Sequence, residues 1–295
     1  MGAGRLYATR MSAQLLSGMP VAEAVLASVR ERVGRLRARG VVPTLATILV
    51  GDDPASHGYV RKKHETCEQV GMVSVDARLS IGATAAELQA LIRRFNADPA
   101  VHGVLVQSPL PKGLDFNAAL LELDPKKDAD GLHPESIGRL AVGSPGPVPA
   151  TPAGIDAMFQ HYGIDVAGLH VAIVGRGPTL GRPLSLLLSA ARKGGNAAVT
   201  LLHSRVPDWQ RFTRRADVVV VGVGIPGVLQ PDAVRPGAVV VSAGITWQGK
   251  KLIPDVHESV GEVASWITPR LGGVGVTTVA LLLENTVTLA EAATG

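Results

Sequence analysis

Several residue types are scarce in this sequence, and their scarcity excludes whole classes of protein. Of the 295 residues only Cys67 is a cysteine, so an internal disulfide and a metal site built from several cysteines are both excluded. Cys67 falls in a predicted helix, where a buried apolar role is expected for it. We therefore predict no cysteine chemistry and no metal site.

Aromatic residues are also rare, at 3% of the chain, and lysine and arginine form no dense block. The basic runs at residues 30–39 and 211–215 have helical spacing beside apolar residues, which is typical of solvated helix faces. A nucleic-acid surface normally carries clustered basic residues or stacking aromatic ones, so nucleic acid is not an expected partner.

Long hydrophobic runs are absent as well. Apolar stretches such as residues 218–223 fall far short of the ~20 residues that span a bilayer, and the N-terminus lacks the apolar core of a signal peptide. We expect a cytoplasmic protein with no membrane-spanning segment.

The composition is typical of a well-packed α/β protein. Hydrophobic residues make up 46% of the chain, charged residues 18%, and there are 34 glycines. A chain of this length normally forms one large or two medium domains. The 29 basic and 25 acidic residues give a net charge of +4, which favours small anionic ligands.

Strands and helices alternate from about residue 13 onward. Residues 44–50 form an apolar, β-rich run, and Asp53 and Pro54 then provide an N-cap and a first turn for a helix that carries Lys63. A later apolar run at residues 101–106 predicts a strand that ends at Gln107. Because ligands gather at the carboxyl ends of strands in open α/β sheets, Gln107 is placed for binding.

The stretch 143–149 is rich in proline and glycine and is the most loop-like in the chain. We place the domain boundary there, with a first domain at residues 1–148 and a second at 149–276. The predicted fold class is α/β, with two α/β domains of which the second contains a Rossmann-like parallel sheet.

The second domain opens with an apolar run at residues 169–174, which leads into Gly175, Gly177 and Gly181. A strand, a glycine turn and a helix start are what a dinucleotide needs, because its pyrophosphate approaches backbone N–H groups at a helix N-terminus. The third glycine comes one residue late for the standard spacing, and a tight strand-to-helix turn is the alternative explanation. The order of elements favours cofactor binding, followed by a helix at residues 184–191.

The next predicted strand, residues 198–202, leads to Ser204 and Arg205. An NAD-specific site usually has a carboxylate here for the ribose 2′-hydroxyl, and this sequence has none. Arg176, Ser204 and Arg205 can instead bind a 2′-phosphate, so NADP is the expected cofactor. Two later strands end at Gly224 and Gly244, where a nicotinamide ring could lie close to the backbone.

The first domain contains a second group of candidates. Tyr59 and Lys63 are four residues apart and share a helix face. A lysine that exchanges protons near neutral pH needs a lowered pKa, and Gln107 can orient its amine without adding charge. Asp130 can accept paired N–H donors from an aminopyrimidine-type ring. The alternatives are a surface lysine at position 63 and a turn residue at position 130.

From about Met11, itself a candidate for the true start, the sequence resembles the methylenetetrahydrofolate dehydrogenase/methenyltetrahydrofolate cyclohydrolase family along nearly its whole length. The resemblance rests on several motifs in order. These are residues 50–56, Tyr59-Val60 with Lys63, Gln107 with Pro109-Leu110-Pro111, residues 127–131, Thr151-Pro152, Gly181-Arg182-Pro183 and residues 272–275.

The resemblance implies a role for each matching residue. Lys63 corresponds to the family's catalytic lysine and Gln107 to the glutamine that tunes it. Tyr59 corresponds to the tyrosine that packs on the folate, and Asp130 to the aspartate that binds the pterin. The remaining matching positions add substrate-binding candidates at Pro109, Leu110 and Gly273, and cofactor-binding candidates at Thr151, Arg182 and Ile245.

The implied function is NADP-dependent oxidation of 5,10-methylenetetrahydrofolate and hydrolysis of the methenyl product to 10-formyltetrahydrofolate, within one-carbon metabolism and purine biosynthesis. The implied substrates are tetrahydrofolate derivatives with an anionic tail of one or several glutamates. The resemblance further implies a homodimer formed through the cofactor domain, and a C-terminal helix, residues 277–295, that returns to the first domain.

The sequence departs from the family pattern mainly around one loop. The departures are Leu271, Val276-Thr277, Ser242-Ala243, Pro254, Ser108 and Ala150. Because the central groups are retained, we expect a competent enzyme with altered geometry near that loop.

Other functions remain as alternatives. One is a diverged paralogue with one of the two activities, and another is a non-catalytic NADP-binding regulatory protein. A two-domain enzyme of the shikimate dehydrogenase type would share the architecture but would not account for residues 109–111 and 128–131.

Overall fold

The computed structural model describes residues 13–52, 54–249 and 251–295, and of residues 54–57 and 59 it describes the backbone. Met11 and Asp53, named above as a start and an N-cap, lie outside the described residues. The helices are α1 Met19–Ala38, α2 Pro54–Gln69, α3 Ala85–Ala97, α4 Phe116–Glu122, α5 Pro134–Val142, α6 Ala150–His161, α7 Gly181–Ser189, α8 Gln210–Thr213 and α9 Val274–Thr294, with short 3₁₀ turns at Pro125–Lys127, Pro231–Ala233 and Glu258–Glu262. The strands are β1 Gln14–Leu15, β2 Thr44–Val50, β3 Val73–Leu79, β4 Gly103–Val106, β5 His170–Val174, β6 Ala198–Leu202, β7 Val218–Val221, β8 Val239–Ser242, β9 Ile245–Gln248, β10 Lys251–Pro254 and β11 Trp266–Ile267.

The first sheet is parallel and has the strand order β3-β2-β4. Its central strand, β2, is buried at every position, so both of its faces are covered. Ala46, Ile48 and Val50 pack against α3 and α4, while Leu45 packs with α1, α2 and α9. This explains why β2 reads as a continuous apolar run rather than an alternating one.

The second sheet has the order β1-β11-β8-β7-β5-β6 and is also parallel. From β5 the chain moves outward to β6 and then returns to β7 on the other side, which gives a topological switch point between β5 and β7. One face packs on α6 and α7, and the other on α8 and the turns Pro231–Ala233 and Glu258–Glu262. The second domain is therefore Rossmann-like, as predicted.

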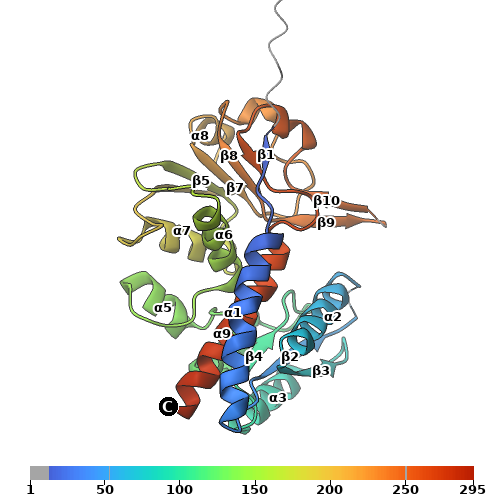
Figure 1. Ribbon diagram of the computed structural model, residues 1–295. Coiled ribbons are helices and arrows are strands. Elements are labelled where there is room, and N and C mark those ends of the chain that lie inside the picture. The colour runs from blue at the N-terminus through green and yellow to red at the C-terminus, as the bar shows by residue number, and fades with distance from the viewer. Residues whose placement is uncertain (1–12, 53, 250) are drawn as a thin grey trace, which may run out of the picture.

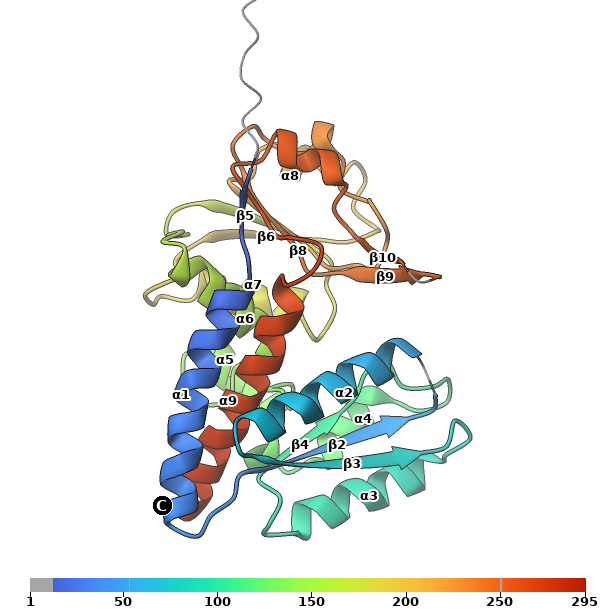
Figure 2. The ribbon, with the colours of Figure 1, turned by 45° about the vertical axis from the view of Figure 1, so that its right-hand side comes forward.

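Helices α1 and α9 lie side by side, run in the same direction and join the two sheets (Figure 1). At their N-termini the Gly18 N–H donates to the Gly272 carbonyl over 2.7 Å. Further along, Arg32 Nη2 lies 2.6 Å from Glu291 Oε2. The second view shows α9 leaving the upper sheet and ending beside the lower one (Figure 2), so the C-terminal helix returns to the first domain as predicted.

Helix α9 qualifies one sequence-based prediction. By length and composition it is the one described helix that could cross a membrane, although the longest apolar runs had seemed too short. Of its most apolar window, 61% is buried, against α1, α6 and the first sheet. We interpret it as a core helix, because an apolar helix buried on most sides is typical of a protein interior.

Several predicted boundaries need correction. The helix expected at residues 184–191 begins at Gly181 and ends at Ser189, because Ala190 is extended. The strand expected at 101–106 begins at Gly103, since Val101 instead closes a turn onto the Asp98 carbonyl. Gln14 and Leu15 fall in the range predicted for the first domain, yet they form β1 and pair with β11 in the second sheet.

Candidate active site

Lys63 and Gln107 come from different structural units and meet at the carboxyl edge of the first sheet. The chain leaves β2 into α2, which carries Lys63, and leaves β4 directly into Gln107. Since β2 and β4 are adjacent and β3 lies on the far side of β2, this edge contains the sheet's switch point. Lys63 Nζ donates a hydrogen bond to Gln107 Oε1 over 2.8 Å.

The surroundings of Lys63 favour a neutral amine. The residue is only 7% exposed, and burial lowers the pKa of Lys63 to about 8, against a smaller opposing effect of the Asp130 charge. Gln107 Nε2 donates to the Ser108 carbonyl over 2.7 Å, which holds the amide with its oxygen toward the lysine. The pair can therefore hold or release a proton near neutral pH.

Asp130 is fixed by the segment that precedes it. Asp128 is buried and accepts hydrogen bonds from the His133 N–H at 2.8 Å and the Ser136 hydroxyl at 2.7 Å. Burial raises the pKa of Asp130 to about 7, while the nearby charge of Lys63 opposes the rise. Gly131 then turns with φ +70°, where a Cβ would lie 2.7 Å from backbone atoms of residues 148 and 149. The turn that carries Asp130 is thus held by more than the single turn considered from sequence, and the charges of Asp130 and Lys63 act on each other.

The other predicted substrate residues are placed less uniformly. Tyr59 lies in α2, but its side chain is outside the described part of the structure. A cis peptide bond joins Ser108 to Pro109, and Leu110 packs against the apolar core under the first sheet. Gly273 forms the N-cap of α9, where its carbonyl lies so close to Gly18 that a Cβ at position 18 would clash with it.

The glycine loop has the shape that a dinucleotide cofactor requires. A Cβ at Gly181 would lie 1.8 Å from the Gly175 carbonyl oxygen, and one at Gly175 would lie 2.5 Å from the Gly222 carbonyl oxygen. Gly177, in contrast, has nothing within 4 Å of its Cβ position. Gly175 and Gly181 therefore serve close packing at the switch point, while Gly177 leaves open space in front of the start of α7.

The residues predicted to bind the 2′-phosphate lie at the carboxyl edge of the second sheet. Arg176 follows β5, and Ser204 and Arg205 follow the neighbouring strand β6, and all three side chains are exposed. The next strands place Gly224 after β7 and Gly244 after β8, as expected for the nicotinamide end. The residues present therefore fit NADP, with a bare backbone at its centre and guanidinium groups at one end.

Thr151 and Arg182 differ in their surroundings. The Thr151 hydroxyl accepts a hydrogen bond from the Thr278 hydroxyl over 3.2 Å, which ties α6 to α9. The Arg182 side chain lies exposed in the first turn of α7, and the Arg182 backbone N–H donates to the Gly177 carbonyl over 3.2 Å. Ile245 pairs with Pro254 in the β9–β10 hairpin.

Sequence reasoning did not identify Asp255. This residue is fully buried, and its Oδ2 accepts the N–H groups of Val223 at 2.7 Å and Gly224 at 2.9 Å. Burial raises the pKa of the Asp255 carboxyl, and the N–H groups oppose that rise. The only signal in the sequence is an aspartate between apolar residues, at the end of the run 252–256.

Two cavities lie elsewhere among the described residues. One of about 850 Å³ is lined by α5, the loop after it and α7, and includes none of the predicted site residues. A smaller one of about 250 Å³ lies behind β10, near Arg270. No group of three or more potential metal ligands occurs in the part of the chain that the structure describes.

A buried lysine bonded to a glutamine in one domain, and a Rossmann-like glycine loop in the other, define an NAD(P)-dependent enzyme of two α/β domains. The family model described as "Tetrahydrofolate dehydrogenase/cyclohydrolase, catalytic domain" matches residues 16–130. The model of the same family's NAD(P)-binding domain matches residues 149–294. The chain belongs to the tetrahydrofolate dehydrogenase/cyclohydrolase family.

Individual relatives agree along the whole chain. "Bifunctional protein FolD" of Syntrophotalea carbinolica is 59% identical over 281 residues, which cover 95% of this chain and 97% of that protein. "Bifunctional protein FolD 1" of Salinispora tropica is 53% identical, with 96% and 93% covered. The structure of the Trypanosoma brucei methylenetetrahydrofolate dehydrogenase-cyclohydrolase, complexed with NADP and an inhibitor, matches with a TM-score of 0.90 at 33% identity, with 96% and 99% covered.

Proposed function

We propose that this chain oxidises 5,10-methylenetetrahydrofolate with NADP and hydrolyses the resulting 5,10-methenyltetrahydrofolate to 10-formyltetrahydrofolate. The observation that carries the proposal is the 2.8 Å hydrogen bond between Lys63 and Gln107, and the charge of Asp130 acts on the same lysine. The group combines an amine that can exchange protons with a carboxylate that can accept hydrogen bonds from the pterin. Hydrolysis of the methenyl group of a bound folate requires both.

For the oxidation, the protein's share is to bind and orient the two reactants. Bound NADP supplies the hydride acceptor. Arg176, Ser204 and Arg205 would bind its 2′-phosphate, and the backbone around Gly177 leaves room for its pyrophosphate. Asp130 would hold the aminopyrimidine edge of the folate and so orient its methylene carbon.

For the hydrolysis, Lys63 handles the protons. Water adds to the methenyl carbon and gives a proton to the neutral amine of Lys63, whose pKa of about 8 keeps a useful fraction uncharged. The hydroxyl on that carbon then loses its proton as the C=O bond forms, the bond from the carbon to N5 breaks, and N5 takes a proton. The formyl group stays on N10, and one proton is released overall. Gln107 orients the amine throughout and adds no charge.

The departures from the family pattern are compatible with both steps. Thr277 is fully buried, and its side chain fits against Gly154, where a Cβ would come within 2.5 Å of the hydroxyl. Leu271 is 69% exposed and leaves the Lys63 group untouched. A paralogue with one activity is the second candidate, because Leu271 lies in the loop before α9 and Thr277 in the first turn of that helix.

Further properties extend the proposal. We infer a division into residues 1–148, completed by 277–295, and residues 149–276, with the two residues of β1 added to the sheet of the second domain. We also infer a cytoplasmic homodimer that acts in purine biosynthesis, on folates whose tail carries one or several glutamates. The mild positive charge of the chain supports an anionic tail.

The test compares wild type with Lys63→Met and, as a matched control, Lys62→Met, because Lys62 is exposed on the same helix. Absorbance is followed with methylenetetrahydrofolate and NADP, and separately with methenyltetrahydrofolate alone. We expect wild type and Lys62→Met to perform both reactions, and Lys63→Met to lose hydrolysis by at least ~100-fold, the range of a general acid–base group. A wild type that binds NADP and turns over neither substrate contradicts the proposal.

A further inference from the structure

Asp255 connects the end of β10 to the loop that follows β7. Its Oδ2 accepts hydrogen bonds from two successive N–H groups, Val223 at 2.7 Å and Gly224 at 2.9 Å, and the Ile225 N–H also acts on the same carboxyl. The side chain has no exposed surface, and its Oδ1 has no hydrogen-bond partner. A buried carboxylate is costly, so this one must stabilise a specific conformation of the loop.

The same carboxylate packs against the loop after β8. A Cβ at Gly244 would lie 1.9 Å from Asp255 Oδ2, so only glycine fits there. The Asp255 N–H also donates to the Gly244 carbonyl over 3.1 Å. The loop carrying Gly224 is held from a second side by the Thr246 hydroxyl, which donates to the Gly224 carbonyl over 2.9 Å. One side chain therefore fixes two strand ends.

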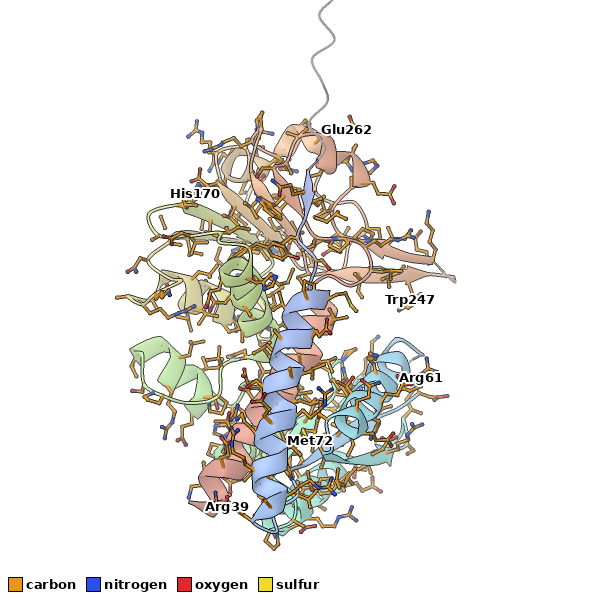
Figure 3. The ribbon with its side chains drawn as sticks, viewed as in Figure 1. Arg39, Arg61, Met72, His170, Trp247 and Glu262 are labelled. Atoms are coloured by element: carbon orange, nitrogen blue, oxygen red, sulfur yellow. The ribbon has the colours of Figure 1, made fainter. Side chains whose placement is uncertain are left out.

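These strand ends adjoin the glycine loop. The Gly222 carbonyl, one residue before Val223, is the atom that a Cβ at Gly175 would meet at 2.5 Å. The β9–β10 hairpin projects from this region on the side of α2, as the positions of Trp247 and Arg61 show (Figure 3). Asp255 thus lies beneath the surface that the nicotinamide half of NADP would cover.

We propose that Asp255 is a positioning residue for NADP, which sets the loop Val223–Gly224–Ile225 and Gly244 in the geometry that accepts the nicotinamide half. The inference rests on the proposed function for the identity of the cofactor. Asp255 itself does not touch the reactants and acts through backbone N–H groups. Its removal should affect the dehydrogenase and leave the Lys63 group of the first domain intact.

The experiment uses the full chain with Asp255→Ala, Asp255→Asn and the control Asp232→Asn, because Asp232 is exposed in the same domain. NADP binding is titrated by calorimetry, and thermal unfolding is recorded. Both activities are measured, and hydrolysis is assayed in the absence of NADP. We expect Asp255→Ala to weaken NADP binding about tenfold or more, since it leaves buried N–H groups without an acceptor. Asp255→Asn, which keeps an acceptor oxygen of lower strength, should weaken it about threefold.

Hydrolysis should stay within about twofold of wild type in every folded variant, the range expected for a distant independent site. The inference is overturned if folded Asp255→Ala and Asp255→Asn bind NADP as wild type does, or if both activities fall equally, which indicates a general structural role. If Asp255→Ala does not fold, Asp255→Asn decides on the same criteria. Failure of wild type itself to bind NADP would contradict the proposed function instead.

Discussion

Gln107→Glu places a carboxylate where the structure has a neutral amide, 2.8 Å from Lys63 Nζ. At an effective dielectric constant of about 20, two unit charges at that separation attract by about 6 kcal/mol, which corresponds to roughly 4 pKa units. Burial of the new carboxylate opposes the gain, so we expect the pKa of Lys63 to rise by at least about 2 units. From a starting value of about 8, it would then exceed 10.

The expected consequence is a loss of neutral amine. At a pH equal to the wild-type pKa of about 8, half of the Lys63 side chains are uncharged, and in the variant about 1% would be. Because the neutral amine accepts the proton from water, hydrolysis should slow by about 50-fold at that pH. The wild-type rate should rise as pH increases through about 8, and in the variant this rise should move to higher pH.

The assay follows the absorbance of methenyltetrahydrofolate across a pH series, after subtraction of the rate without enzyme. Gln69→Glu serves as the control, since it makes the same chemical change at an exposed position of α2. If Gln107→Glu hydrolyses the substrate at the wild-type rate and with the wild-type pH profile, the neutral-lysine mechanism is refuted.

Three further predictions test the two sites. Asp130→Asn removes the charge that raises the pKa of Lys63, so the pH profile of hydrolysis should shift to lower pH and the KM for folate should rise about tenfold. Gly181→Ala should lower the free energy of unfolding by at least about 3 kcal/mol in urea titrations, because its Cβ would lie 1.8 Å from the Gly175 oxygen. Arg205→Ala should weaken NADP binding about tenfold in calorimetry and leave NAD binding unchanged.

The sequence predicted the Lys63 group because its members obey local rules. The apolar run before Gln107 ends in an amide, and parallel strands bring their carboxyl ends to one edge, so the partners of a strand-end residue can be anticipated. The capping box of Thr84 and Glu87 at the start of α3 depends on the same kind of local signal. In each case the signal lies within a few residues of the feature.

The features that were missed depend on contacts between distant segments. β1 is two residues long, too short to show an alternation of apolar and polar residues. Its partner β11 is separated from it by most of the chain. Asp255 is recognisable only through its hydrogen bonds with the N–H groups of Val223 and Gly224, and no sequence spacing predicts these bonds. The fit of Thr277 against Gly154 likewise exists only once α6 and α9 are packed.

The pairing of β1 with β11 has a consequence for synthesis of the chain. Trp266, the partner of Gln14, is made 252 residues after it. At about 5–20 residues per second, the ribosome needs roughly 13–50 s to cover that interval. During this time α1 lacks α9, which covers part of its apolar side in the folded protein. Until Trp266 and α9 have been made, the nascent chain is therefore a natural client for chaperones that shield apolar surface.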